Sequence, residues 1–509
     1  MENKPNIVLI MADQLGAKFL PAYGHKVVKT PNIDNLAKKG VVFKNAYCTS
    51  PLCGPSRMSM MTGLLPSAVG AFDNASELPA SQPTFVHYMR QQGYKTCLSG
   101  KMHFAGPDQL HGYEKRVTTD IYPTDFGWTA NWYDSEVKVR FQDMTNVLNV
   151  GPCTRSMQID YDEEVAYRGI KQIYDFAREK DDNPFFLTIS FTNPHDPYTP
   201  LEKYWNLYDD AEIDLPEVPF IPLEERDSHS KRLYYHYSTD EANLNETDIR
   251  RMRHGYYGSI SYIDDKVGDI MSALESSGEL ENTIVIFTAD HGDMAGERGM
   301  WYKKNFFDHS LQVPLIVTAP KIFSAKYVDN VVSHLDFLPT FAAMSGCSDS
   351  DILETNGANL MGLLSGESDL ADRPVRAEYL AEGVFDPVFM IRNSKYKFIY
   401  SKNDISTLYD MENDPKELND LSQSEEHKGL IAEYQKDADS YWDNESLKQR
   451  IIIDQKRRKL VFEAQKHGEF PKWDYQPFED ASKQYVRAGI WTTVAEAAAY
   501  LAPKNPVEK

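Results

Sequence analysis

Residues Asn6-Ile-Val-Leu-Ile-Met-Ala-Asp-Gln14 form an apolar run that ends abruptly in two polar side chains. The run hardly alternates between apolar and polar residues, which is typical of a strand buried on both faces, as in a parallel sheet. We therefore predict a first strand over residues 6–12. Asp13 and Gln14 follow at the carboxyl end of that strand, where open α/β sheets bind their ligands.

Three further apolar runs also end in polar residues. These residues are Lys101 and His103 after residues 94–98, His195 and Asp196 after residues 185–192, and Asp290 and His291 after residues 283–288. Helical patterns lie between the runs, for example over residues 162–180 and 250–277. This alternation predicts an α/β fold with a doubly wound sheet, so we expect the four strand ends to form one shared site.

The pattern changes from about residue 376. Short strands with turns between them, over residues 388–392, 396–400 and 407–409, predict a small antiparallel subdomain. Residues 430–468 have a helical pattern, and we interpret their basic run Gln455-Lys-Arg-Arg-Lys459 as a solvated helix face. The segment from Gly468 onward is rich in aromatic and turn residues and resembles an extended arm. The expected division is a catalytic domain over 1–375, a β subdomain over 376–430, and a helical segment with a tail over 431–509.

The composition restricts the possible classes of function. Lysine and arginine total 54 and aspartate and glutamate total 76, so the formal net charge is −22. Nucleic-acid binders and polybasic membrane modules need clustered positive charge, so the charge balance argues against both. The five cysteines are widely spaced and odd in number, which fits neither a disulfide framework nor a zinc pattern.

The chain also offers no obvious membrane or export signal. No apolar run approaches the roughly 20 residues that a membrane span needs. The apolar stretch over residues 6–12 lacks a basic leader and a small-residue cleavage site, so we interpret it as a strand and not as a signal peptide. We therefore expect a cytoplasmic protein.

The most informative segment is Ser50-Pro-Leu-Cys-Gly-Pro-Ser-Arg-Met-Ser-Met-Met-Thr-Gly63. Pro55 suits the first turn of a helix, and Gly63 suits its end. Cys53 would then lie just before the helix N-terminus, where free backbone N–H groups favour an anion, and Arg57 would follow one turn later. From these residues alone, Cys53 is either a buried structural cysteine or a thiolate nucleophile whose pKa the helix end lowers.

The same segment resembles the signature of the formylglycine-dependent sulfatases, a family in the alkaline phosphatase superfamily. Its motif, Cys-x-Pro-Ser-Arg followed by Thr-Gly, is present from Cys53 to Gly63. The resemblance implies that a separate maturation enzyme oxidises Cys53 to an aldehyde, formylglycine. It also implies an alkaline-phosphatase-like mixed sheet sandwiched by helices, with a smaller C-terminal antiparallel sheet and an extended tail. Further residues fall in the family's order, namely Asp13, Lys101, His103, His195, Asp290, His291 and Lys303.

A divalent metal is part of what this resemblance implies. Its ligands would be Asp13, Gln14, Asp290, His291 and the modified residue 53. Oxygen ligands with one imidazole suit Ca²⁺, Mn²⁺ or Mg²⁺ better than zinc, and the family favours Ca²⁺. Many sulfatases have a second Asp in place of Gln14 and an Asn in place of His291. This departure leaves the identity of the metal open.

The other catalytic roles are also carried over by resemblance. One hydroxyl of the hydrated aldehyde would attack sulfur, and His103 would be the base that lets the other expel sulfate. Arg57 and Lys101 would hold the hydrated aldehyde or its sulfate. His195 and Lys303 would bind the sulfuryl group and assist the leaving oxygen, as charged groups do in phosphoryl transfer.

Segments along nearly the whole chain look like the choline sulfatases in particular. Examples are Ser99-Gly-Lys-Met-His-Phe104, Asp125-Phe-Gly-Trp128, Asn193-Pro-His-Asp-Pro-Tyr198 and the terminal Trp473-Asp-Tyr-Gln-Pro477. Other sulfatases generally lack this tail. In the choline sulfatases it is associated with oligomer contacts, which implies a homo-oligomer, either a dimer or a tetramer.

The substrate implied by this resemblance is choline O-sulfate, a small ester with a cationic head group. A quaternary ammonium donates no hydrogen bonds and is best held by aromatic faces and carboxylates. Trp128 is the leading candidate for the aromatic wall. The other candidates for substrate binding are Asn74, Asn146, Glu382 and a tail acid, Asp480 or Asp474.

Two alternatives stay open. The first is a hydrolase of other sulfate esters, or of phosphonate and phosphate esters, because the Gln14 and His291 pattern also occurs in that branch of the superfamily. The second is a protein in which Cys53 stays a thiol and the aldehyde chemistry is absent.

Overall fold

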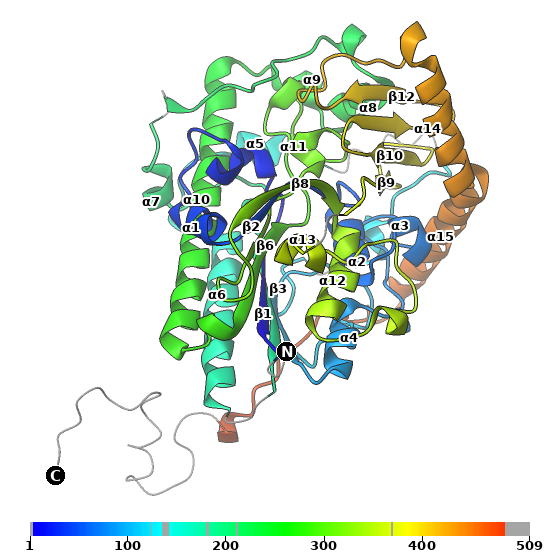
Figure 1. Ribbon diagram of the computed structural model, residues 1–509. Helices are drawn as coiled ribbons and strands as arrows, with labels where there is room; N and C mark the ends of the chain where they lie inside the picture. Colours follow the sequence, from blue (N-terminus) through cyan, green and yellow to red (C-terminus); the bar gives the residue numbers. More distant parts are fainter. Residues whose placement is uncertain are drawn as a thin grey trace, which may run out of the picture.

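A computed structural model describes residues 4–122, 124–134, 142–179, 183–209, 212–367 and 370–483. Its centre is an eight-stranded sheet in the order β4-β3-β5-β1-β6-β7-β2-β8 (Figure 1). The strands are β1 (Asn6–Ala12), β2 (Val41–Tyr47), β3 (Lys95–Gly100), β4 (Lys115–Arg116), β5 (Phe185–Ser190), β6 (Thr283–Ala289), β7 (Leu315–Thr318) and β8 (Lys326–Ser333).

The middle of the sheet follows the apolar runs of the sequence. β1 pairs in parallel with β5 and β6, and every residue of these three strands is buried. β7 departs from the parallel pattern, since it runs antiparallel to both β6 and β2. A parallel connection needs a long crossover, usually a helix, whereas residues 290–314 contain only single helical turns and bring the chain back at the same end. The predicted mixed sheet is confirmed.

Helices cover both faces of this sheet. α6 and α10 pack together with α1 on one face, and α2, α4 and α12 form the layer on the other (Figure 1). The helices are α1 (Pro31–Lys39), α2 (Cys53–Thr62), α3 (Pro66–Val69), α4 (Phe85–Gln91), α5 (Thr145–Leu148), α6 (Met157–Arg178), α7 (Glu202–Trp205), α8 (Ser228–His236), α9 (Thr239–Ala242), α10 (Glu246–Ser277), α11 (Asp308–Leu311), α12 (Phe337–Met344), α13 (Met361–Ser365), α14 (Lys428–Tyr441) and α15 (Asn444–Gln465).

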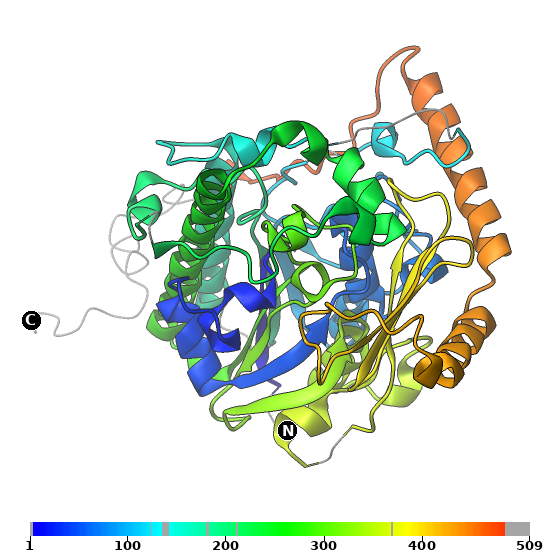
Figure 2. The same ribbon diagram turned by 90° about the horizontal axis from the view of Figure 1, so that it is seen from above.

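A separate four-stranded antiparallel sheet follows, in the order β12-β11-β10-β9. Its strands are β9 (Val375–Tyr379), β10 (Val388–Arg392), β11 (Tyr396–Tyr400) and β12 (Ser406–Asp410). α14 packs against β10 and β11, and α15 then runs along the outside of the molecule (Figure 2). The predicted antiparallel subdomain is confirmed.

The single helix expected over residues 430–468 is wrong in detail. Two helices form because Trp442 leaves the helical path to stack on Phe389, with ring centroids 4.1 Å apart, and Asp443 caps the start of α15. The interpretation of residues 455–459 as a solvated face is also wrong in part. Gln455 and Arg458 are buried, with contacts to Trp132 and Asp73, whereas the other three residues of the run are exposed.

The described part of the tail lies along the molecule. Trp473 packs edge-on against Phe126, with ring centroids 5.0 Å apart, and Glu479 forms an ion pair with Arg168 of α6. Within the ranges described above, no helix is long and apolar enough to cross a membrane.

Candidate active site

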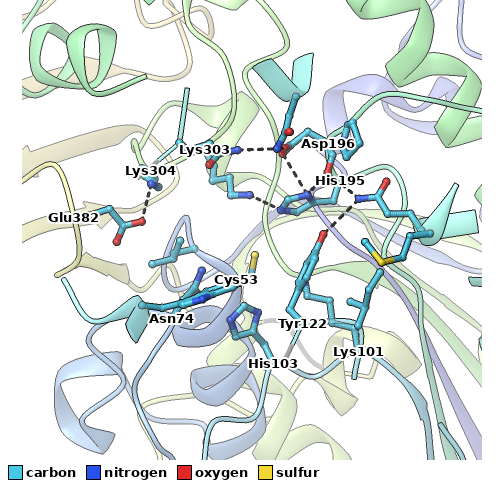
Figure 3. A pocket seen from close by; sticks show the side chains of 18 of the residues that line it. Cys53, Asn74, Lys101, His103, Tyr122, His195, Asp196, Lys303, Lys304 and Glu382 are labelled. Atoms are coloured by element: carbon cyan, nitrogen blue, oxygen red, sulfur yellow. Dashed lines mark hydrogen bonds and ion pairs between the residues drawn. The ribbon is translucent and has the colours of Figure 1, made fainter. Parts of the chain in front are cut away.

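The polar residues that follow β1, β3, β5 and β6 meet at the carboxyl edge of the central sheet. Beside them lies a cavity of about 560 Å³ whose lining includes Cys53, Lys101, His103, His195 and Lys303 (Figure 3). These side chains come from four separate segments, which follow β2, β3, β5 and β6, and the strands place them together because all four strands end at the same edge. The expectation of one shared crevice therefore matches the geometry.

Cys53 is the first residue of α2, preceded by Leu52 as the N-cap residue. Every residue of α2 is buried, and Gly63 ends the helix in the left-handed region at φ 65°. The thiol of Cys53 points into the cavity, with Sγ 3.1 Å from Nε2 of His291 and 3.9 Å from Oδ1 of Asp13 (Figure 3). The next residue is fixed as well, since the backbone N–H of Gly54 donates to Oδ1 of Asn74 at 2.9 Å.

Arg57 is fully buried beneath the cavity and does not line it. Its Nη2 donates to Oδ2 of Asp13 and its Nε to Oδ2 of Asp290, each at 2.9 Å, while Nη1 donates to the carbonyl of Lys101 at 2.6 Å. The guanidinium thus binds both carboxylates of this site, and its role in holding the hydrated aldehyde or its sulfate stays a prediction. Lys101 also binds Asp13, with Nζ 2.6 Å from Oδ2.

Asp13, Cys53, Asp290 and His291 form a buried cluster in which one donor atom from each lies within 4.8 Å of all the others. Nδ1 of His291 lies 2.9 Å from the carbonyl of Gly292, which puts the proton on Nδ1 and leaves Nε2 free to bind a metal. Two carboxylates, one imidazole and an oxygen at position 53 would suit a hard divalent cation, so the residues fit the metal that the sequence implied.

The charges around this cluster keep its carboxylates ionised. Burial alone would raise the pKa of Asp13, but Lys101 and the neighbouring cations outweigh it and hold that pKa well below its usual range. Burial likewise opposes ionisation of Asp290, and Arg57 is the main cause of its lowered pKa. The protein thus supplies anionic oxygen ligands at neutral pH.

Gln14 lies next to the cluster, but its side chain forms hydrogen bonds with residues outside the cluster. Its Oε1 accepts a hydrogen bond from Nζ of Lys303, and its Nε2 donates to Asp293 and, at 3.3 Å, to Oδ1 of Asp196. Lys303 Nζ also lies 2.9 Å from Nε2 of His195. Gln14 therefore orients the Lys303 and His195 pair in this structure, and its role as a metal ligand stays a prediction.

His103 is buried against the cavity in the left-handed backbone region, at φ 60°. Within the described part of the chain, neither ring nitrogen has a hydrogen-bond partner. Burial, reinforced by the charge of Lys101, lowers the pKa of His103 to about 3. The imidazole is consequently neutral at physiological pH, with one of its two ring nitrogens unprotonated.

The outer walls of the cavity contain most of the residues predicted to bind substrate. Trp128 is 37 % exposed and packs edge-on against His103, with ring centroids 5.8 Å apart. Asn74, Asn146 and Glu382 also line the cavity. Asp480 does not line the cavity of its own chain: it follows Glu479, which is held at α6.

Sequence reasoning assigned no individual role to three further residues of the cavity. Tyr122 lies between Lys101 and Trp128, with Nζ of Lys101 4.4 Å from its ring centroid. Lys304 forms an ion pair with Glu382, at 2.6 Å, and Asp196 accepts from Nδ2 of Asn146 at 2.9 Å. All three lie beside residues that the sequence singled out, but only the folded chain shows which neighbours turn inward.

Comparison with known proteins places this site in a family. A sulfatase family model matches residues 5–347, which include the whole cluster around Cys53. The chain belongs to the sulfatase family. Two further models match its C-terminal part, that of N-sulphoglucosamine sulphohydrolase C-terminal regions over residues 296–443 and that of choline sulfatase C-terminal regions over residues 449–499.

Similar proteins agree with this sulfatase assignment. A choline-sulfatase of Rhizobium meliloti is 40% identical over 95% of this chain and 96% of its own length. An arylsulfatase of Clostridium perfringens is 29% identical over 84% and 92%. This sulfatase is accordingly a sulfuric ester hydrolase.

Solved structures show the same fold. A 2-O GAG sulfatase superposes with a TM-score of 0.69 at 25% identity, over 86% of this chain and 92% of its own. A phosphonate monoester hydrolase of Agrobacterium radiobacter reaches a TM-score of 0.67 at 22% identity, over 88% and 96%. The sulfatase fold is thus alkaline-phosphatase-like, as the sequence predicted.

Proposed function

We propose that this sulfatase hydrolyses choline O-sulfate to choline and inorganic sulfate. The observation that carries the proposal is the similarity to a choline-sulfatase along nearly the full length of both chains. The match of residues 449–499 to the C-terminal region of choline sulfatases supports it further, because this segment lies outside the general sulfatase model.

The cavity walls are suited to a small cationic head group. A trimethylammonium group is attracted to the faces of aromatic rings and to carboxylates. Trp128 and Tyr122 lie with ring centroids 6.2 Å apart, and Glu382 lines the same cavity. We infer that Trp128 and Glu382 contact the ammonium and that Asn74 and Asn146 contact the ester. The tail acid Asp480 would act only if a neighbouring subunit brought it to this cavity.

At the sulfuryl end, formylglycine at position 53 would supply the nucleophile and a divalent cation bound by Asp13, Asp290 and His291 would supply Lewis-acid stabilisation. Ca²⁺ is favoured, with Mn²⁺ and Mg²⁺ as alternatives, and Gln14 would be a further ligand. Lys101 and Arg57 keep the Asp13 carboxylate ionised.

The remaining polar residues act on the substrate oxygens and on protons. Lys303 Nζ is a charged donor held in place by Gln14, and it is positioned to bind a sulfuryl oxygen. His195 accepts from Lys303 at Nε2, and this pair would supply the proton that the leaving choline oxygen needs. His103 is neutral and lies beside residue 53, where it can take up the proton released when sulfate departs (Figure 3).

The partners of the enzyme belong to the same proposal. A maturation enzyme must oxidise Cys53, and the tail would link subunits into a dimer or tetramer. We also infer a cytoplasmic location, which rests on the sequence alone.

Two measurements test the proposed function. Mass spectrometry of the peptide containing Cys53, from a host with the maturation enzyme, should show formylglycine; an unmodified thiol would refute the aldehyde mechanism. On matured protein, kcat/KM should be higher for choline sulfate than for an aryl sulfate or a phosphonate monoester. A higher kcat/KM for the aryl sulfate or for the phosphonate monoester would refute choline sulfate as the preferred substrate.

A further inference from the structure

The buried residues of α15 contact the back of the substrate cavity. Arg458 binds Asp73 through two parallel contacts, Nη1 to Oδ1 at 2.6 Å and Nη2 to Oδ2 at 2.9 Å. Both side chains are buried, with exposed fractions of 5 % and 0 %. Nη1 of Arg458 also donates to Oγ1 of Thr129 at 3.2 Å, and Oδ2 of Asp73 accepts from the backbone N–H of Ala130 at 3.1 Å.

A second contact joins α15 to the same region. Oε1 of Gln455 accepts from the backbone N–H of Trp132 at 2.8 Å, and the indole N–H of Trp132 donates to the carbonyl of Ala381 at 2.8 Å. The ring of Phe462 packs so closely on Gly127 that a Cβ there would lie 2.8 Å from Cζ. Arg458 and Gln455 thus anchor segments 73–76, 127–132 and 381–382 to one helix.

Each anchored segment carries one residue of the cavity wall. Asn74 follows Asp73, Trp128 precedes Thr129, and Glu382 follows Ala381. These three wall residues approach the cavity from different parts of the chain. Their relative positions therefore depend on the contacts made by α15, because a buried bidentate ion pair with further hydrogen bonds fixes geometry closely.

We propose that Arg458 is a positioning residue that sets the shape of the head-group end of the substrate cavity. The guanidinium never touches substrate; it holds Asp73 and Thr129, and with them Asn74 and Trp128. Segment 449–499, which contains Arg458, matches the C-terminal region of choline sulfatases and lies outside the general sulfatase model. This segment would therefore influence which substrate binds without contacting the substrate itself. The inference rests on the proposed function for the identity of the head group.

The test uses the full matured enzyme with two substrates, choline sulfate and ethyl sulfate, which lacks the head group. Arg458→Met alone would leave the Asp73 charge buried without its partner. We therefore use the double variant Asp73→Asn with Arg458→Met, and the conservative variant Arg458→Lys, which keeps the charge but not the two parallel contacts. Arg457→Met is the matched control, since Arg457 is the exposed neighbour on the same helix.

The double variant should raise KM for choline sulfate roughly tenfold, as expected for displaced binding groups, with kcat changed less than about twofold. The KM of Arg458→Lys for choline sulfate should lie between the values of the wild type and the double variant. KM for ethyl sulfate should rise less, because only Asn74 among the displaced residues contacts the ester, and both constants in Arg457→Met should stay at wild-type values. An unchanged KM for choline sulfate in the double variant, or an equal increase in KM for both substrates, would overturn the inference.

Hydrogen exchange separates this inference from the proposed function. Backbone amides of residues 73–76 and 127–132 should exchange faster in the double variant than in the control, whatever the substrate is; unchanged exchange would overturn the inference. If the wild-type enzyme does not prefer choline sulfate over ethyl sulfate, the proposed function fails while the exchange result still tests the anchoring.

Discussion

Single residues of this sulfatase have roles that their identity suggests only in part. Arg57 and Cys53 belong to one sequence motif, and the motif correctly predicts that they lie one helical turn apart. The motif does not show that Arg57 binds Asp13 and Asp290, because those contacts depend on where the two strands that carry these carboxylates end. The contacts of Gln14 with Lys303 and Asp293 are equally invisible in the sequence, since they join residues almost 300 positions apart.

At Trp128, removal of the ring should selectively weaken binding of the ester that carries a cationic head group. Trp128→Ala should raise KM for choline sulfate about tenfold, the scale of a partly desolvated cation–π contact. KM for an aryl sulfate, which has no cation, should rise much less. Steady-state kinetics on both substrates tests this prediction. Equal increases in KM would show that Trp128 does not contact the ammonium group.

His334 offers a test of the electrostatics of the fold. Burial lowers its pKa to about 3 from the usual 6.5, and its Nε2 lies 3.3 Å from Oγ1 of Thr288. As pH falls below 6.5 the unfolded chain takes up a proton here that the folded chain does not, so the folded state loses up to about 1.4 kcal/mol per pH unit.

His334→Asn should therefore flatten the loss of stability between pH 6.5 and pH 4. The measurement is the free energy of unfolding of both proteins by urea at several pH values. The variant starts from a lower value at pH 7, because a buried contact is lost, but its curve should be shallower. Parallel curves would contradict the lowered pKa.

Among the elements, those with strong patterns were the most predictable. The four apolar runs became β1, β3, β5 and β6, with ends within a few residues of those expected, because strands buried on both faces need continuous apolar sequence. The antiparallel direction of β7 could not be predicted, since direction depends on the connection and not on the strand. The break at Trp442 has no glycine or proline to mark it, and only the capping Asp443 hinted at it.

The end of α2 gives a prediction at this scale. Gly63 has φ 65°, and a Cβ there would lie 2.8 Å from Oγ1 of Thr355 and 2.9 Å from Cβ of Leu338. Gly70 has φ 76°, and a Cβ there would meet no atom within 4 Å. Gly70→Ala should cost about 1 kcal/mol from backbone strain alone.

Gly63→Ala should cost at least about 1 kcal/mol more, because the added methyl group also overlaps packed side chains. Urea unfolding of the two variants gives the difference directly. Equal losses would show that the neighbours of Gly63 relax freely and that the end of α2 is not tightly packed.

For the whole molecule, the sequence motifs, including the family resemblance, predicted the main catalytic layer and the smaller sheet. They did not predict that α15 would bury Arg458 and Gln455 against the catalytic layer, because a basic run on a helix normally faces solvent. The net charge of −22 is compatible with the cationic head group of the proposed substrate.

Removal of the metal should affect activity more than folding. Asp13 and Asp290 already have Arg57 and Lys101 as partners, so the metal-free protein should stay folded with a lowered Tm. Dialysis against a chelator should lower kcat/KM at least about 100-fold, the scale of other transition-state stabilisers. Added Ca²⁺ or Mn²⁺ should restore it; unaltered activity after verified metal removal would exclude the proposed metal site.

The most direct test of the central claim compares choline sulfate with 3,3-dimethylbutyl sulfate, which has the same shape with carbon in place of the charged nitrogen. On matured enzyme, kcat/KM should be at least about tenfold higher for choline sulfate, because only its head group is attracted to aromatic faces and carboxylates by its charge. Equal kcat/KM values for the two esters would contradict the proposal that this sulfatase recognises choline sulfate.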